Sequence, residues 1–459
     1  MTRCSRPVWC VAGFAILSAG FFFNIAEAAQ STAATSTVAA PLLTLDEALT
    51  MALASNRNVK IASLGIDASR QQFLQAKTKR FPAMNAYLFG GESLGTIGLT
   101  IKKGQFGTFQ STGPIPSQDI RISTSNTPTA FVALQVTQPL LALHKINLNI
   151  DAAKLATDQA GEQSRSTRQS IAASVRQAYY GVVQAQEAVG AVQADIQQYE
   201  ELDRITTEYV LEKTALESDS LQAKAALAQQ QYSLMQAQDK LESAKESLNE
   251  LLGRDINVPF STAETGGLQS SEMSLQEAQM LALAQQPTVR EAALTVKQAD
   301  VQRRLAKAQY VPDLNVSLRY ISPFGIDFLP TNIAAVGFEF KWDPFDWGGR
   351  GHTVRQKEIA VEQSKQQLEE TKAQVLVNVS NQFRALEEAR TAVSVAKLAQ
   401  QATHEKLRET TNAYGQKTVL LRDVLQQQAA DQSANAQYEQ AIAAFWTAKA
   451  NLDKAIGEE

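Results

Sequence analysis

The sequence repeats itself over half of its length. Leu45-Asp46-Glu47-Ala48 returns as Leu275-Gln276-Glu277-Ala278, an offset of 230 (275 − 45), and Arg80-Phe81-Pro82 returns as Tyr310-Val311-Pro312. Later in each copy, Lys213-Thr214-Ala215-Leu216 matches Lys417-Thr418-Val419-Leu420, an offset of 204 (417 − 213). A repeat of this length is half of a protein and not a small stacked unit. We therefore predict two structural repeats, residues 29–260 and 261–459, that together form one fold.

The start of the chain has the pattern of an export signal. Arg3 and Arg6 precede an apolar stretch at 11–23, and Ala26-Glu27-Ala28 forms a small-x-small cleavage pattern. An uncleaved membrane anchor is the alternative, but the apolar stretch is short for a spanning helix. We predict a signal peptide at residues 1–28.

Cleavage there leaves a mature chain with few chemical options. Both cysteines, Cys4 and Cys10, lie in the leader, so disulfides, thiol catalysis, cysteine metal sites and a lipid anchor are not expected. The mature chain has 41 basic (43 − 2) and 46 acidic (47 − 1) residues, which gives no basic surface for nucleic acid. No later apolar run approaches the ~20 residues of a spanning helix. Such a chain is either soluble outside the inner membrane or a β-barrel in an outer membrane.

Each half contains two long stretches with coiled-coil spacing. Apolar residues recur at steps of four and three, a period that favours left-handed supercoiling, at Ile171, Val175, Ala178, Val182, Ala185, Val189, Val192, Ile196 and Tyr199. The second half has the same spacing at Tyr438, Ala441, Phe445, Ala448, Leu452 and Ala455. An ordinary coiled-coil rod explains these helices, but the small alanines also suit helices lying side by side in a cylinder.

Shorter segments alternate between polar and apolar residues, as strands do. Asp313, Asn315, Ser317 and Arg319 alternate with Leu314, Val316, Leu318 and Tyr320, and the returning segment alternates from Val336 to Trp342. Charged groups on one face and large apolar groups on the other are typical of a membrane barrel strand. Trp342 and Tyr320 would lie near the membrane boundary, where amphipathic rings are preferred. A half-buried strand of a soluble sheet is the alternative.

The first half repeats this pattern less cleanly at 84–89 and 132–137, so the chain has four such strands. Because a barrel needs at least eight, several chains must share one barrel. Polar stretches between the strands of each pair, 90–128 and 322–331, are expected to be loops at an outer surface.

With these features the mature chain resembles the TolC-type outer-membrane efflux proteins over its whole length. The resemblance rests on the duplicated L-x-x-A-x-x-x-A opening, on Pro82 and Pro312 after each first helix, and on the paired hairpin ends. It implies an α+β membrane protein: a homotrimer whose 12-stranded β-barrel, four strands per protomer, continues as a long α-helical periplasmic barrel of coiled coils. It also implies an exit duct in the outer membrane of a Gram-negative bacterium, surrounded by lipid, in a tripartite efflux or type I secretion system. The partners would be a periplasmic adaptor (membrane fusion protein) and an inner-membrane pump of the RND, ABC or MFS type.

The resemblance also implies a constriction at the periplasmic end, lined by acidic residues three positions apart. Asp423 falls on the first of these positions and Gln426 on the second, so three carboxylates would ring the pore where the family's archetype has six. Asp219 has the corresponding place in the first half. The arginine that locks the archetype closed would fall on Val419, so that lock is expected to be absent. Arg422 is not expected to replace it, because neighbouring helical residues do not face each other. A solvated helix charge is the alternative for Asp423.

The turns between the paired helices would be the periplasmic tips that contact the adaptor, with Gly415 allowing a tight turn. The residues expected there are Tyr209, Lys213, Thr214, Tyr414, Gly415, Lys417 and Thr418. Hairpin turns without a partner are the alternative.

No motif for bond-making chemistry is convincing. Gly91-Glu92-Ser93-Leu94-Gly95 fits the nucleophile elbow, but an elbow must lead into a helix and glycines follow instead. The three histidines, His144, His352 and His404, have no partner at a metal-ligand spacing. We therefore expect no enzyme and no cofactor. An exported coiled-coil scaffold without a channel is the alternative function; it explains the helices but not the strands.

Overall fold

The computed structural model describes residues 41–92, 98–123, 128–263, 273–325 and 330–458. The predicted signal peptide and Ser93 of the elbow-like motif lie outside these residues. The helices are α1 (Leu45–Ser55), α2 (Arg57–Thr78), α3 (Leu143–Leu211), α4 (Glu217–Leu252), α5 (Leu275–Gln285), α6 (Pro287–Ala308), α7 (Gly349–Gly415) and α8 (Leu421–Ile456). None of the helices in the described part of the chain has the length and apolar composition to cross a membrane.

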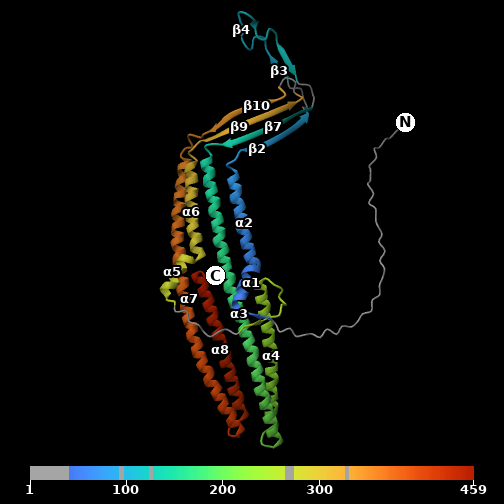
Figure 1. Ribbon diagram of the computed structural model, residues 1–459, viewed down its shortest axis with the longest axis vertical. Coiled ribbons are helices and arrows are strands. Elements are labelled where there is room, and N and C mark those ends of the chain that lie inside the picture. The colour runs from blue at the N-terminus through green and yellow to red at the C-terminus, as the bar shows by residue number, and fades with distance from the viewer. Residues whose placement is uncertain (1–40, 93–97, 124–127, 264–272, 326–329, 459) are drawn as a thin grey trace, which may run out of the picture. The chain divides into compact units, whose positions relative to one another are not determined.

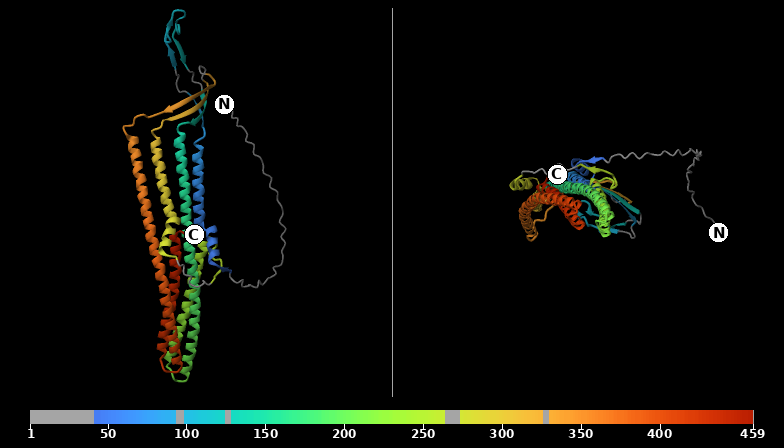
Figure 2. Two further views of the ribbon diagram at one scale, coloured as in Figure 1. Left: turned by 60° about the vertical axis from the view of Figure 1, so that its left-hand side comes forward. Right: turned by 90° about the horizontal axis from the view of Figure 1, so that it is seen from below.

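Two helices, α3 with 69 residues and α7 with 67, run from the strands to the hairpin turns (Figure 1). Near the strands α3 packs against α2 and α6, and α6 packs against α7. Toward the turns α4 packs on α3, α3 on α8, and α8 on α7 (Figure 2). Each half thus contributes one long helix, which packs against one shorter helix of the same half near the strands and against another near the turns.

The four predicted strands form one antiparallel sheet. The strands are β2 (Ala83–Glu92), β7 (Pro128–Pro139), β9 (Asp313–Phe324) and β10 (Ile333–Lys341), in the order β10-β9-β7-β2. The pairing between β7 and β9 joins the two halves of the chain.

The register aligns residues of one kind across all four strands. Met84 is opposite Val136, Val136 opposite Leu318, and Leu318 opposite Val336, which makes an apolar row. The neighbouring row places Asn85 opposite Gln135 and Gln135 opposite Arg319. Arg319 Nη2 lies 3.8 Å from Glu339 Oε2 on the adjacent strand. The alternation predicted from the sequence therefore gives the sheet one largely apolar face and a second face that carries Asp313, Arg319, Glu339 and Lys341.

The stretch at 90–128 was expected to be an irregular loop, and that expectation was too simple. β2 extends to Glu92, and the insertion forms strands β3 (Gly98–Ile101) and β6 (Ile120–Ser123), which pair, and β4 (Thr108–Phe109) and β5 (Gly113–Pro114), which also pair. Leu99 and Ile122 face each other across β3 and β6. These short strands were not recognised in the sequence because Gly, Ser and Thr residues surround them.

The start of each half is built in the same way. Thr44 caps α1 and Ser274 caps α5, and each exchanges hydrogen bonds with a glutamate at the third helical position, Glu47 or Glu277. These hydrogen bonds hold the pKa of both glutamates below the usual range. The predicted L-x-x-A opening is therefore a capping box followed by a buried alanine, Ala48 or Ala278. A short strand precedes each of these helices, β1 (Leu42–Leu43) before α1 and β8 (Ser261–Thr262) before α5, and the two strands pair in parallel.

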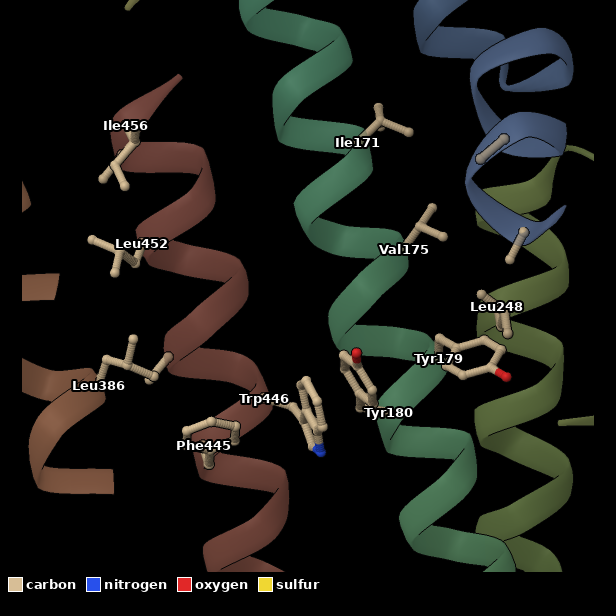
Figure 3. Close-up of a cluster of buried hydrophobic side chains, with 14 of the residues drawn as sticks. Ile171, Val175, Tyr179, Tyr180, Leu248, Leu386, Phe445, Trp446, Leu452 and Ile456 are labelled. Carbon is tan, nitrogen blue, oxygen red and sulfur yellow. The ribbon is translucent and has the colours of Figure 1, made fainter. Parts of the chain in front are cut away.

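The largest apolar core lies where these capped helices pack on the long helices. Tyr180 of α3 stacks on Trp446 of α8 with ring centroids 4.5 Å apart, and Val175 and Leu452 lie above them (Figure 3). Most of the predicted coiled-coil positions between Ile171 and Val182 are buried here. Burial of this apolar surface is the main stabilising term for the helical part.

Gly253 ends α4 and Gly457 ends α8 at this level, and a substitution at Gly253 tests the packing. Gly253, after α4, has φ +72, and a Cβ there would lie 2.4 Å from the Ser55 carbonyl oxygen. We expect Gly253→Ala to destabilise the protein by about 1–3 kcal/mol, from left-handed strain and a backbone clash. Thermal unfolding followed by circular dichroism measures this loss. Gly65→Ala is the matched control, because a Cβ at Gly65 meets nothing within 4 Å; equal melting temperatures of the two variants would contradict the packing described.

Candidate functional site

The two hairpin turns have the same backbone structure. We call residues 209–216 the first tip and residues 413–420 the second tip. In the first tip Lys213 N donates to Val210 O and Thr214 N to Tyr209 O; in the second, Lys417 N donates to Tyr414 O and Thr418 N to Ala413 O, all within 3.0 Å. These pairs close the C-termini of α3 and α7 with the hydrogen bonds of a Schellman-type cap.

The residue that makes each turn tight is a lysine and not a glycine. Lys213 has φ 61 and Lys417 has φ 60, in the left-handed region that costs a non-glycine residue roughly 1 kcal/mol. The expected role of Gly415 was wrong. Gly415 is the last residue of α7, and the chain reverses two residues later. Sequence pattern alone favoured Gly415, because glycine is the usual residue at a turn.

Asp219 and Asp423 have equivalent positions at the start of α4 and α8. Asp219 Oδ2 accepts from Leu216 N at 3.3 Å, and Asp423 Oδ2 accepts from Leu420 N at 3.1 Å. Each carboxylate thus lies in the first helical turn, where it satisfies a backbone donor and interacts favourably with the helix dipole. The sequence-based alternatives for Asp423, pore charge or solvated charge, missed this capping role.

Asp423 and Gln426 lie on one side of α8, three residues apart. The Asp423 side chain is 41% exposed and Gln426 is exposed, so both are accessible within one protomer. Arg422 Nε lies 3.5 Å from Asp423 Oδ1. This contact lies within one helix turn, and the prediction that Arg422 does not replace the locking arginine of the archetype stays a prediction. The pair is exposed and adds little stability.

The two tips contact each other through residues that we predicted to face a partner. The Tyr209 hydroxyl donates to Gly415 O at 3.2 Å, and the Tyr209 and Tyr414 rings lie 5.8 Å apart. Lys417 Nζ lies 4.5 Å from the centre of the Tyr209 ring and 3.4 Å from Glu212 Oε2. Three of the predicted tip side chains therefore connect the two hairpins of one chain.

A buried layer lies just above these contacts. The hydroxyls of Thr206 and Tyr414 are 3.3 Å apart, and Thr206 is fully buried. Leu202, Leu421 and Val424 pack around Tyr414, with Val419 partly buried against them. Thr206 and Glu212 were not predicted from the sequence. Thr206 is an inconspicuous hydroxyl within a long helix, and only its register against Tyr414 identifies it.

The remaining tip residues face outward or cap the turn. The hydroxyls of Thr214 and Thr418 donate to the carbonyls of Tyr209 and Ala413 at 3.1 and 2.9 Å. Lys213 is exposed. Three leucines beside the turns are also strongly exposed: Leu211 at 78%, Leu216 at 70% and Leu420 at 58%. The accessible surface of the tips therefore carries large apolar side chains beside the exposed Lys213.

Comparison with known proteins identifies the class. The sequence profile of the outer membrane efflux protein family matches residues 48–254 and 280–458, so the chain belongs to this family. No curated protein sequence matches the chain.

Solved structures have the same fold. The outer membrane protein VceC from Vibrio cholerae has 18% identity and a TM-score of 0.71, with 90% of this chain and 96% of that chain covered. The CmeC outer membrane channel of Campylobacter jejuni has 16% identity and a TM-score of 0.72, with 90% and 85% covered. The open state of the MtrE outer membrane channel of Neisseria gonorrhoeae has 17% identity and a TM-score of 0.68, with 90% and 89% covered.

Membership in this family assigns the function. The protein is an outer-membrane efflux duct of a tripartite system, and it extends into the periplasm. This favours the duct over the exported coiled-coil scaffold. The family is one of channels and not of enzymes. Among the described residues, no group of three His, Cys, Asp or Glu side chains lies where it could hold a metal ion.

The turn geometry can be tested at Gly415. Because Gly415 is helical and a Cβ there meets nothing within 4 Å, we expect Gly415→Ala to leave the melting temperature unchanged or to raise it. Gly190→Ala, the same change in the interior of α3, is the matched control and should behave alike. A melting temperature lowered only by Gly415→Ala would show that the turn needs a glycine there.

Proposed function

We propose that three copies of the chain form one duct, in which β10 of each protomer pairs with β2 of the next. Within the described residues these two strands are the edges of the four-stranded sheet. Exposed edges carry unpaired backbone groups, and closing the sheet into a ring satisfies them. Three protomers would supply twelve strands (3 × 4), enough to close a barrel. The strands have 10, 12, 12 and 9 residues, close to the ~9–11 of a tilted membrane strand.

The apolar face of this sheet would meet the lipid of the outer membrane. Val336, Phe338 and Phe340 are 73%, 77% and 60% exposed in the single chain, and Trp342 follows at 53%. A contiguous surface of this kind needs an apolar partner. The polar face, with Arg319 and Glu339, would line the water-filled interior.

We further propose that Asp423 and Gln426 line the constriction at the periplasmic end, with Asp219 in the equivalent place of the first half. Their support is the exposure of both residues on one side of α8, close to the second tip. A ring of carboxylates in a narrow pore favours cations over anions. The duct itself is passive, and an inner-membrane pump, with the adaptor, supplies the substrate and the energy.

The capping role of Asp423 makes a sharp test of the constriction possible. Asp423→Asn keeps a side-chain oxygen that can accept from Leu420 N but removes the charge, whereas Asp423→Ala removes both the acceptor and the charge. We expect Asp423→Asn and Asp423→Ala to lower the cation preference of single channels equally, while only Ala lowers stability, by about 1 kcal/mol. Gln426→Glu should raise the cation preference, because it adds a second ring of carboxylates. Planar-bilayer recordings of the purified oligomer measure both effects.

The control in these recordings is Asp239→Asn, a charge change on the exposed surface of α4 far from the second tip. Unchanged conductance and ion preference in all the Asp423 and Gln426 variants would exclude the constriction role. A purified protein that remains monomeric and forms no channels would exclude the trimeric duct.

We propose that the adaptor contacts the exposed part of the tips, with Lys213 and the leucines 211, 216 and 420 as its main contacts. Lys417 is a poor probe, because it also connects the two tips. We expect Lys213→Glu to reduce recovery of the periplasmic adaptor in pull-down experiments without loss of oligomer. Lys240→Glu, exposed on α4 away from the tips, is the matched control. Equal recovery with both variants would favour hairpin turns without a partner.

A further inference from the structure

The seam between α3 and α8 joins the two helical hairpins, α3–α4 and α7–α8. At its end away from the tips it is held by side-chain hydrogen bonds. Gln169 Nε2 donates to Gly457 O at 2.6 Å and Gln177 Nε2 to Asn451 Oδ1 at 2.9 Å. The stack of Tyr180 on Trp446 follows (Figure 3). Burial raises the pKa of Asp453 of α8 in this part of the seam, but Arg176 of α3 and Lys449 lie close enough to compensate its charge.

Toward the tips the same register places carboxylates opposite each other. Seven residues beyond Tyr180 is Glu187, and seven residues before Trp446 is Glu439. Both line a small cavity of about 150 Å³ that also contains Tyr180 and Trp446. Eight positions further along α3 (187 to 195) and eight positions back along α8 (439 to 431) lie Asp195 and Asp431. The antiparallel register thus produces two acidic pairs in succession across one seam.

The environment of the second pair is crowded and weakly compensated. Asp431 is 4% exposed and accepts from Thr403 Oγ1 at 3.0 Å and from Asn435 Nδ2 at 3.3 Å. From α7, His404 Nδ1 lies 3.9 Å from Asp431 Oδ2. Gln428, one turn before Asp431 and 5% exposed, has a side-chain oxygen without a hydrogen-bond donor among the described residues.

Asp195 faces its own neighbours from two other helices. Gln432 of α8 lies beside Asp195 and Tyr199, and its side-chain oxygen accepts from Gln230 Nε2 of α4 at 3.4 Å. Tyr199 is buried and its phenol stays neutral, because burial raises its pKa. Of the groups around Asp195, the titratable ones are therefore Asp431, Tyr199 and, beyond Asp431, His404.

In each pair the pKa of one carboxyl is raised, as expected for like charges that are poorly solvated. Burial, and to a smaller degree the charge of Asp431, raises the pKa of Asp195 to about 6. Burial and the neighbouring Glu187 raise the pKa of Glu439 as well. A carboxyl whose pKa is raised in the packed state stabilises that state when protonated, and this stability is lost as pH rises through the raised pKa.

We propose that proton uptake by the Asp195–Asp431 and Glu187–Glu439 pairs holds the two hairpins together. Proton loss at neutral pH weakens this seam, so that the contacts of Thr206 with Tyr414 and of Tyr209 with Gly415 open and the tip-side parts separate. Protonation removes the repulsion within each pair. The contacts near Gln169 and Tyr180, where Arg176 compensates the charge of Asp453, keep that end of the seam closed at either pH. Given the proposed function as a duct, acid conditions would favour the narrow state of its periplasmic end.

Distances between spin labels on α4 and α7 test this proposal. Across α4, α3, α8 and α7 the labels span three helix packings, roughly 30 Å in total, which suits pulsed electron spin resonance. Lys224 on α4 and Lys406 on α7 are exposed. The only cysteines in the sequence are Cys4 and Cys10, so replacing both leaves the labelled positions as the only thiols. Labelled protomers are diluted into unlabelled full-length chains, so that distances within one chain are measured.

We expect a shorter and narrower distance distribution around pH 5 than around pH 7.5, with a midpoint near the pKa of about 6 of Asp195. Asp195→Asn combined with Glu439→Gln imitates the protonated seam and should abolish most of the shift, leaving the short distance at both pH values. The matched control, Asp239→Asn with Glu246→Gln, removes the same charge from the exposed face of α4 and should keep the full shift.

If the distance distribution of the labelled wild-type protein did not change with pH, the proposal would be overturned. This measurement does not depend on whether the variants fold. A control double variant that loses the shift, or a seam variant that keeps it, would overturn it as well. The labels do not require a conducting pore. Failure here therefore counts against the seam, whereas failure of the bilayer recordings counts against the duct.

Discussion

The packing of α3 on α6 and α8 is the contact on which the arrangement of the two halves depends. α3 belongs to the first half, α6 and α8 to the second, and between the helices of the two halves the described residues make their main contacts here. The stack of Tyr180 on Trp446 and the surrounding core set the register of this contact. Once this register is set, it fixes which residues of α3 meet α8 near the tips, more than four turns away. The contacts between Thr206 and Tyr414, and between the tips themselves, follow from it.

Much of the fold could be predicted from the sequence because its signals are periodic and long. The coiled-coil spacing around Ile171 and the alternation around Leu318 both identified elements that the structure contains. Duplication strengthened each prediction, since an element found in one half was expected in the other. The insertion at 98–123 was missed as structure because strands of four residues or fewer give too short a pattern to recognise.

The candidate site was harder to predict because its contacts join distant parts of the chain. Lys417 was identified as a tip residue, but its contact with Glu212 links positions 205 residues apart. The left-handed lysines could not be recognised either, since glycine at position 415 is the stronger turn signal by composition. The capping role of Asp423 was visible in principle: an acidic residue in the first turn of a helix is a known N-terminal signal.

Asp423 can both cap the start of α8 and line a pore, and the geometry of the tip explains how. A carboxylate in the first turn of a helix uses one oxygen for the backbone donor of Leu420, while the other stays on the exposed side, here near Arg422. The backbone hydrogen bond limits the rotation of the side chain, so the charge is held at a defined place at the end of α8. In a trimer the same bond would hold three such charges at equal heights. Asp219 repeats the arrangement on α4. A residue that first serves to begin a helix is thus also well placed to define the electrostatics of a pore, because the helix end fixes its position more firmly than a loop could.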